Sequence, residues 1–472
     1  MAIKKGTTSH SNIRGAGNMT HILHYNTHAE RRYFTGKNRE MYDLVGLNGN
    51  IVSFSPTGTA AFLASISKPF YIDPQTHAFQ HDTIHLKTKG SRKNQELHFK
   101  PSIVKLANDR LGEPFSNVIN NDIPLSPDVF YNSNGTLNSS LITRICRNVI
   151  SFQSKFLIDS IDDETRDFLD NPNDLLPHFY IAPYFFLSSI LWEKWLAINI
   201  AAYRISKDLY RDKPVYLELV LSQAILPNIQ DICDQIVRDI ADVDGILLWI
   251  DGNAEEELTR LEVANYIHLL HCLRRKTNTI INIHGGYLSS LLCHNDLKNN
   301  LSGIGHSANY GEHREVVPVG GGIPRARFYL QKAHSRLHFS DAADIVINKN
   351  WHTSKDLYQN NVCSCIKCDE LIKQYGTPEA AFNAYGDSNV TVVPFKGSIL
   401  RFEYPTPEAK EAGIMHYLYN KKYEIDSLNN HSLIELLSKM ESDYQEISSV
   451  KGSEFADYLE IWRLELLQAL DS

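Results

Sequence analysis

Short apolar or β-branched runs alternate along this chain with longer segments of helical periodicity, and this alternation strongly limits the folds that the chain can adopt. Eight of these runs are predicted to be strands. They lie at residues 70–73, 179–182, 215–221, 246–250, 279–283, 302–305, 327–330 and 344–347. Strands that alternate regularly with helices favour a parallel sheet, and eight of them favour a closed barrel. We therefore predict an α/β fold, a (β/α)8 barrel of the TIM type.

The chain is long enough for this barrel and for a smaller additional unit. Its 472 residues are 43% hydrophobic, which is ample for a buried core. We predict an N-terminal segment at 1–66, the barrel at 67–350, and a zinc-binding and helical C-terminal subdomain at 351–472. An insertion at 81–177 follows the first predicted strand, and it is too long for an ordinary βα loop.

Three of the seven cysteines, Cys363, Cys365 and Cys368, fall close together in the pattern C-x-C-x2-C. Such a turn can present three thiolates to one tetrahedral zinc, whose fourth ligand must come from elsewhere in the chain. The alternative is a group of reduced surface thiols, but exposed clustered thiols oxidise readily. The remaining cysteines stand singly in apolar helical surroundings and are predicted to be small core residues. They are Cys146, Cys233, Cys272 and Cys293.

Polar residues fall at the ends of several predicted strands. Asp73 and Asp251 each close one, the segment His284-Gly285-Gly286 follows another, and Asp344 lies in the last. The carboxyl ends of barrel strands meet at one mouth, where this fold places its chemistry. Any one of these aspartates could instead cap the following helix. Three of them together favour a shared site.

Charge and targeting signals narrow the function classes. The net charge of −8 argues against a general nucleic-acid coat, although Lys87, Lys89, Arg92 and Lys93 form a local basic cluster that could follow a phosphate backbone. Such a cluster is also common on an ordinary solvated surface. The N-terminus lacks the apolar core of a signal peptide, and no apolar run approaches the length of a membrane span. We expect a cytoplasmic protein that does not enter membranes.

Several local segments resemble the tRNA-guanine transglycosylase superfamily, over about residues 70–440. Ile250-Asp251-Gly with its following acidic run is similar to that family's "FDE" strand end, and Asn282-Ile-His284-Gly285-Gly286 is similar to its "VQGG". The segment from Gly305 to Glu312 is similar to "GGLAVGE" and Arg325-Ala-Arg327-Phe-Tyr-Leu to "RPRYLMG". Ala343-Asp344-Ile-Val-Ile is similar to "FDCVLP", and the family carries its zinc subdomain after the barrel, as predicted here.

The resemblance implies a role for each of these residues. Base exchange at a nucleoside C1′ requires a nucleophilic carboxylate and a group that protonates the leaving base. By resemblance Asp344 is the nucleophile, Asp73 the acid/base and Asp251 the acceptor for the N–H edge of a guanine-type base. The other residues implied to bind the base are His284, Gly285, Gly286, Gly305 and Glu312. His284 stands where the family has glutamine, but it can still donate a hydrogen bond.

The resemblance also implies that the zinc is structural and that its fourth ligand is a late histidine. His431 falls where the family has this ligand, while His352 and His416 remain alternatives. The segment 369–407 lengthens the gap between the cysteines and the late histidine relative to the family.

Two departures from the family point to its branch that places 7-deazaguanine bases in DNA, the DpdA-like transglycosylases. Residues 348–352 replace the run that reads the tRNA anticodon loop, and the insertion at 81–177 is added. We predict exchange of guanine in DNA for a base such as 7-cyano-7-deazaguanine, with the basic cluster on the phosphates and possible partner subunits of a DNA-modification cluster. Trp351 is a candidate for filling the stack when a base is flipped out, although packing is the commoner role of such a residue. The alternatives are an enzyme that acts on tRNA and a catalytically inactive nucleic-acid-binding subunit.

Overall fold

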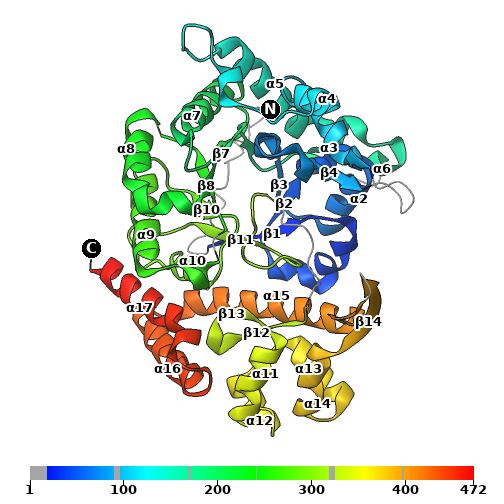
Figure 1. Ribbon diagram of the computed structural model, residues 1–472, viewed down its shortest axis with the longest axis vertical. Coiled ribbons are helices and arrows are strands. Elements are labelled where there is room, and N and C mark those ends of the chain that lie inside the picture. The colour runs from blue at the N-terminus through cyan, green and yellow to red at the C-terminus, as the bar shows by residue number, and fades with distance from the viewer. Residues whose placement is uncertain are drawn as a thin grey trace, which may run out of the picture.

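Eight parallel strands curve into a nearly closed barrel at the centre of the molecule (Figure 1). The computed structural model describes residues 19–89, 96–167, 172–240, 242–252, 254–317, 325–395 and 398–471. The barrel strands are β1 (Thr20–Tyr25), β2 (Leu44–Asn48), β3 (Phe70–Asp73), β6 (Tyr180–Ile181), β8 (Val215–Ser222), β9 (Gly245–Asp251), β10 (Ile280–Asn282) and β11 (Gly303–Ser307). Strand β11 pairs with β1, and the His178 backbone N–H donates to the Phe70 carbonyl at 2.7 Å, which bridges β3 and the start of β6. A short strand, β7 (Phe186–Leu187), also pairs with β8.

Six of the eight predicted strands are confirmed as barrel strands, and two are wrong. The run at 327–330 forms an antiparallel hairpin, β12 (Arg327–Leu330) with β13 (Ser335–His338), and the run at 344–347 lies in helix α11 (Phe339–Asn348). Because the buried residues of α11 recur at three- and four-residue intervals, the run fits a helix face as well as a strand. The two missing places are filled by β1 and β2, so the barrel begins inside the segment predicted at 1–66.

Helices surround the barrel, and the predicted insertion lies between β3 and β6. It therefore follows the third barrel strand, not the first. The surrounding helices are α1 (Gly49–Phe54), α2 (Pro56–Ile66), α7 (Trp192–Leu209), α8 (Ile229–Asp239), α9 (Arg260–Arg274) and α10 (Tyr287–Leu291). The insertion contains the hairpin β4 (Lys87–Lys89) and β5 (Leu97–Phe99), followed by α3 (Pro101–Lys105), α4 (Phe115–Asn121), α5 (Ser139–Ser160) and α6 (Asp163–Asp167). Helix α5 packs its apolar face on α2 and α7.

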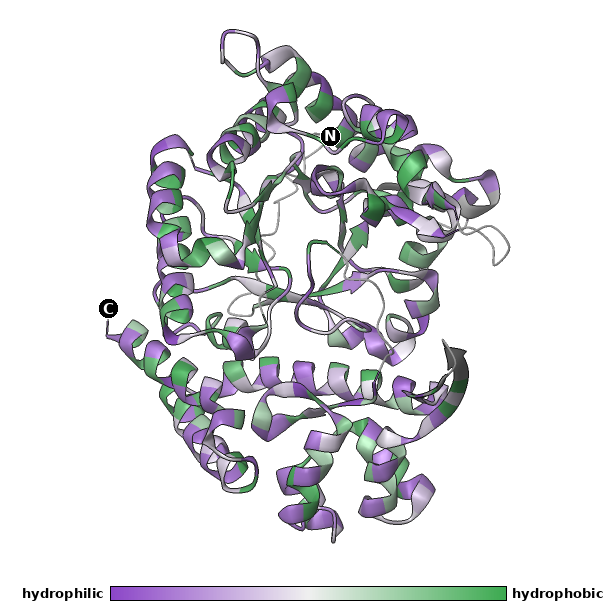
Figure 2. Ribbon diagram, viewed as in Figure 1, coloured by the Kyte–Doolittle hydropathy of each residue, from purple (hydrophilic) through white to green (hydrophobic). Residues whose placement is uncertain are grey.

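The hydrophobic core has two layers, one inside the barrel and one between the strands and the helices. Figure 2 shows the apolar strands at the centre and polar residues along the outer faces of the helices. Large apolar side chains fill most of the barrel interior. The interior residues include Ile22, Leu44, Tyr71, Phe179, Ile181, Tyr216, Val220, Leu247 and Ile281.

The C-terminal part of the chain packs along one side of the barrel (Figure 1). After β13 and α11 it consists of α12 (Lys355–Asn361), α13 (Ile366–Tyr375), α14 (Pro378–Asn383), the hairpin β14 (Ser388–Phe395) and β15 (Ser398–Pro405), α15 (Pro407–Asn430), α16 (Leu433–Lys451) and α17 (Asp457–Leu470). Helix α15 crosses beside the barrel and contacts α10 and β12. In the part of the chain that is described, no helix has the length and apolar character needed to cross a lipid bilayer.

A buried ionic network helps to hold the C-terminal part against the barrel. Lys421 of α15, which is fully buried, forms ion pairs with Glu312 from the loop after β11 and with Glu424. Glu424 also lies 3.1 Å from Nδ1 of His334, whose Nε2 lies 3.6 Å from Asp443 of α16. Burial lowers the pKa of His334, but the two carboxylates outweigh burial and hold this pKa above its ordinary value. Such a network stabilises the fold only while every member keeps its partner.

The network predicts that replacing His334 is more harmful at low pH. Because the folded-state pKa of His334 is raised, the stability from its protonated ring is fully present below the unfolded pKa of about 6.5 and is lost as pH rises through the folded value. We expect His334→Gln to lower the free energy of unfolding by about 3–5 kcal/mol near pH 6. The loss should shrink near pH 9. Urea unfolding at both pH values measures this, with His431→Gln at the exposed end of α15 as the control; equal losses at the two pH values would contradict it.

Candidate active site and metal centre

Three carboxylates from the barrel strands face the interior: Asp73 and Asp251 stand at strand ends by the mouth, and Glu218 lies deeper, in the middle of β8. Side chains alternate between the two faces of a strand, so the inward position of Tyr71 puts Asp73 on the inner face at the end of β3. The same alternation puts Glu218 of β8 and Asp251 of β9 on the inner face. Among the described residues, these are the carboxylates that the barrel strands contribute. The predicted convergence of Asp73 and Asp251 at one mouth therefore matches the structure.

Glu218, which is fully buried, and Asp73, which is half-buried, form a carboxylate pair beside Tyr184. The Tyr184 hydroxyl donates to Oδ1 of Asp73 at 2.7 Å, and the Gln75 backbone N–H donates to the same oxygen at 2.8 Å. Burial raises the pKa of Asp73, although these two hydrogen bonds and the Arg314 cation partly offset it. Burial and then the Asp73 charge raise the pKa of Glu218 well above its ordinary value. No described donor lies in bonding geometry to either Glu218 oxygen, so burial and the neighbouring Asp73 charge both favour the protonated form of Glu218.

Two histidines stack on one another near the ends of β1 and β10. His24 of β1 and His284, which follows β10, have ring centroids 4.8 Å apart. Burial lowers the pKa of His24 to about 4, so the ring is neutral at physiological pH, and its Nε2 lies 2.8 Å from the Ile283 carbonyl. A Cβ on Gly46 would lie 2.7 Å from Nδ1 of His24, and one on Gly305 would lie 3.1 Å from Nε2. Glycine in β2 and β11 therefore makes the space that the imidazole occupies.

A small cavity of about 140 Å³ opens beside Asp73. Its walls include the rings of His77 and Trp249, whose centroids are 5.4 Å apart, and the side chain of Arg314. A cavity of roughly 150 Å³ holds one small aromatic ring. The site can therefore accept a planar ring against aromatic side chains, next to a carboxylate and a guanidinium.

Residues 314–317, which follow β11, lie across the mouth and are held there by Asp251. Oδ1 of Asp251 accepts the Val316 backbone N–H at 2.6 Å, and the Trp249 indole N–H donates to the Arg314 carbonyl at 2.9 Å. Val316 packs into the apolar interior of the barrel. In this structure Asp251 thus positions the loop over the cavity.

The other residues implied to bind the base shape the rim. The Gly286 backbone N–H donates to Glu255 at 2.9 Å, and a Cβ on Gly286 would lie 2.7 Å from that carboxylate. The Gly285 N–H donates to the Gly305 carbonyl at 3.0 Å, which links the ends of β10 and β11. Glu312 is buried in its ion pair with Lys421. His284 stacks on His24, and its ring centroid lies 4.6 Å from that of Trp249, which lines the cavity.

Asp344 does not lie at the mouth. It is on α11, its side chain is 61% exposed, and its carboxylate pairs with Lys451 of α16 at 3.0 Å. The expectation that Asp344 and Asp73 share a site is therefore wrong in this structure. The reason is the closure of the barrel by β1 and β2, which leaves no strand position for 344–347.

The residues predicted to contact nucleic acid are in different environments. Lys87 pairs with Asp122, while Lys89 of β4 is exposed. Arg92 and Lys93 lie outside the described residues. Trp351 is only 6% exposed, and the Lys332 ammonium lies 5.5 Å above its ring. It is a packing residue here, so it cannot enter a base stack without rearrangement.

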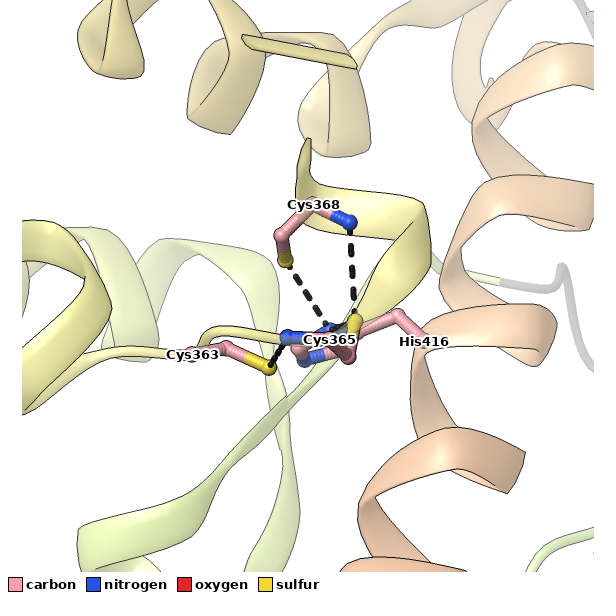
Figure 3. A group of neighbouring side chains, drawn as sticks. All are labelled: Cys363, Cys365, Cys368 and His416. Carbon is pink, nitrogen blue, oxygen red and sulfur yellow. Dashed lines mark hydrogen bonds between the residues drawn. The ribbon is translucent and has the colours of Figure 1, made fainter. Parts of the chain in front are cut away.

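The three clustered cysteines come together with His416 of α15 (Figure 3). The donor atoms of Cys363, Cys365, Cys368 and His416 all lie within 4.8 Å of one another. Nδ1 of His416 is 3.5 Å from the Cys365 sulfur and 3.4 Å from the Cys368 sulfur. His431 is exposed at the end of α15, and its Nδ1 lies 3.0 Å from the Ser427 carbonyl. The prediction of His431 as the fourth ligand is wrong, and the alternative His416 takes its place.

This Cys3His group can hold a metal ion. A tetrahedron with metal–ligand bonds of about 2.0–2.3 Å has edges of roughly 3.3–3.8 Å, which the sulfur–nitrogen distances match. Nε2 of His416 lies 2.8 Å from the Tyr329 carbonyl, so it carries the proton and leaves Nδ1 free to ligate. Burial raises the pKa of Cys368, but contacts with the other thiols and His416 outweigh burial and bring this pKa well below its ordinary value. The thiolate that a metal needs is thus favoured.

Sequence reasoning missed Glu218, Tyr184 and His24. Glu218 had a usable signal, because it is a carboxylate inside the otherwise apolar strand VYLELVLS. A charge there must face either a hydrophobic layer or a functional site. Tyr184 and His24 had no comparable signal. Tyr184 follows a two-residue strand, and His24 lies in a strand that was not recognised.

A larger cavity of about 990 Å³ lies where the barrel rim meets the C-terminal part of the chain. The hairpin β12–β13 contributes Arg327 and Arg336, Arg325 lies just before it, and the rim contributes Glu30 and Glu312. None of the three barrel-strand carboxylates lines it. Its walls carry charges of both signs, so charge alone does not select one class of ligand.

No protein-family model matches this chain, and neither the curated proteins nor the solved structures provide a match. The fold by itself supports many different reactions. Function must therefore be argued from the chemistry of the site.

Proposed function

We propose that the protein is a glycosyl-transferring enzyme that exchanges the base of a nucleoside through a covalent intermediate. The observation that carries this proposal is the pair of half-buried Asp73 at the mouth and fully buried Glu218 below it, which share the Tyr184 hydroxyl as a neighbour. Retaining glycosyl transfer needs two carboxyl groups about 5 Å apart, one ionised and one protonated. Two groups whose surroundings separate their protonation states fit that requirement.

In this proposal Asp73 is the nucleophile. It faces the cavity, accepts two hydrogen bonds and lies near Arg314, and all three features stabilise its charged form. Its carboxylate would attack C1′ of the sugar, and the electron pair of the broken C1′–N bond would pass to the leaving base. The carboxyl of Glu218 would supply the proton to that base. The incoming base would return a proton to Glu218 as it displaces Asp73 from C1′.

The remaining groups would bind the base. The rings of His77 and Trp249 line the cavity at 81° to one another, so a heterocycle could stack on one of them and meet the edge of the other. Asp251 would accept the N–H edge of a guanine-type base in exchange for the Val316 amide that it now holds. That exchange requires the loop after β11 to move from the mouth when substrate enters.

We further propose that the Cys3His group binds zinc with a structural role. Three thiolates and one imidazole in tetrahedral spacing suit this ion, and no ligand position is left open for a reacting molecule. The group also lies in the C-terminal part of the chain, outside the small cavity at the mouth. The ion would tie the Cys363–Cys368 turn to α15.

For the substrate we retain the proposal of guanine in DNA, with a 7-deazaguanine base as the incoming partner. This proposal is supported by two features of the sequence, the altered run at 348–352 and the long insertion that lies between β3 and β6. Lys89 is exposed on the insertion's hairpin, where it could meet a phosphate backbone, whereas Lys87 is occupied by Asp122. Phosphate contacts of this kind depend on salt but carry no sequence information.

The assay is incubation of the purified full-length protein with labelled guanine and either duplex DNA or tRNA. We expect the label to enter DNA in exchange for unlabelled guanine, and unlabelled 7-cyano-7-deazaguanine to chase it out. Incorporation into tRNA alone would overturn the DNA assignment and keep the reaction class. No incorporation into either nucleic acid, by protein that binds DNA tightly, would favour an inactive binding subunit and contradict the proposed enzyme.

A further inference from the structure

A second cluster of metal-binding side chains lies on the outside of the barrel. Cys233 is on α8, and His268 and Cys272 are one helical turn apart on α9, which packs against α8 (Figure 1). Their donor atoms all lie within 4.8 Å of one another. The sulfur of Cys272 is 3.6 Å from Nε2 of His268. We call these three residues the α8–α9 cluster.

The geometry of the α8–α9 cluster is that of ligands rather than of unrelated core residues. An i, i+4 pair on one helix points to the same side, and here both members face a thiol from the neighbouring helix. The 3.6 Å separation matches the edge of a tetrahedral site with one sulfur and one imidazole ligand. Both thiols are buried, whereas the imidazole is partly exposed, so an ion could enter along the His268 side.

Two side chains near the α8–α9 cluster carry oxygen atoms that could serve as a fourth metal ligand. Oε1 of Gln230, one turn before Asp234 on α8, lies 2.8 Å from Nε2 of His268. The Gln230 side-chain N–H donates to the Asp234 carboxylate at 2.7 Å. Either oxygen or a water could complete a tetrahedron around an ion bound to Nε2. Two thiolates with one imidazole select soft or borderline ions over calcium or magnesium.

We propose that Cys233, His268 and Cys272 form a second metal site, separate from the Cys3His group, which takes one divalent ion of the zinc class. The ion would cross-link α8 to α9 on the outside of the barrel. With three protein ligands and one exchangeable position, it should bind more weakly than the ion of the four-ligand group. This inference does not depend on the proposed base exchange.

Equilibrium dialysis of the reduced full-length protein against zinc, followed by elemental analysis, tests the site. We expect two zinc ions per chain at saturation. The more weakly bound ion should be lost in Cys272→Ala. His268→Ala lies on the partly exposed side of α9, so this variant should still fold. It should lower the affinity for the second zinc ion at least tenfold, because even the loss of a residue that only hydrogen-bonds a ligand costs that much. Cys146→Ala is the matched control, because Cys146 is a buried helical thiol whose sulfur contacts the Ala202 carbonyl.

The outcomes separate the alternatives. Two ions in the wild type and in Cys146→Ala, with one in Cys272→Ala and a weakened second ion in His268→Ala, would support the site. One ion in the wild type at saturating zinc, or unchanged binding of the second ion in His268→Ala, would overturn it. A Cys233–Cys272 disulfide in protein purified under reducing conditions would also overturn it, because the thiols would then serve as a redox pair.

Discussion

A His416→Ala variant is expected to lose its tightly bound zinc and to unfold far more easily than the wild type. Binding free energy at a structural zinc site is folding free energy, about 10–16 kcal/mol in small zinc-finger peptides. His416 is fully buried between the cysteines and the Tyr329 carbonyl, so its loss removes one ligand and opens a cavity as well. We expect a loss of more than about 4 kcal/mol, measured by urea unfolding with elemental analysis of the folded protein.

His431→Ala is the matched control, because it removes a histidine from the exposed end of the same helix. This variant should keep its zinc and its stability. The opposite pattern, with zinc lost in His431→Ala and kept in His416→Ala, would restore the ligand set that the sequence resemblance implied. Cys365→Ser should behave like His416→Ala, since all four donors are needed to fill the tetrahedron.

Asp73→Asn is expected to abolish base exchange. Loss of a nucleophile typically removes several orders of magnitude of rate, and we expect at least about a thousandfold loss in kcat. The variant should fold, because asparagine has nearly the same shape and removes a charge that is costly to bury. Steady-state exchange with labelled guanine gives the rate, and the unfolding curve checks the fold.

Asp344→Asn provides the comparison for Asp73→Asn, since it alters an exposed aspartate paired with Lys451. Its exchange rate should stay within about twofold of the wild type, because such surface pairs contribute little. Near-normal exchange in Asp73→Asn together with inactive Asp344→Asn would contradict the placement of the chemistry at the mouth. The exchange rate of Glu218→Gln should lie between those of Asp73→Asn and Asp344→Asn, because glutamine keeps the shape of the protonated acid but cannot release a proton.

Much of the barrel could be predicted from the sequence, because most of its strands carry short apolar runs separated by helical segments. The runs at β8 and β9 are of this kind. Strands β1 and β2 escaped because they contain histidine, asparagine and glycine, the residues that build the mouth. The polar residues and glycines that build the mouth thus interrupt the apolar pattern by which β1 and β2 would be recognised as strands. The run at 344–347 was misassigned because four apolar residues fit a helix as well as a strand.

The three cysteine ligands of the metal centre could be predicted from the sequence, but the histidine ligand could not. The three cysteines lie within one turn of chain, and their spacing alone indicates a shared ion. The histidine comes from a helix beyond the hairpin β14–β15, so only the packing of α15 decides between His416 and His431. In the same way, Asp73 was found at a strand end, whereas its pairing with Glu218 depends on how the strands close into a barrel.

The central claim, that the chemistry belongs to the carboxylates of the barrel strands, is tested most directly by locating the covalent intermediate. Protein would be mixed with a guanine-containing DNA substrate, quenched in acid and digested, and the peptide carrying the added sugar would be sequenced by mass spectrometry. We predict the sugar on the peptide that contains Asp73, with no adduct in Asp73→Asn. An adduct on the peptide that contains Asp344 would contradict the account.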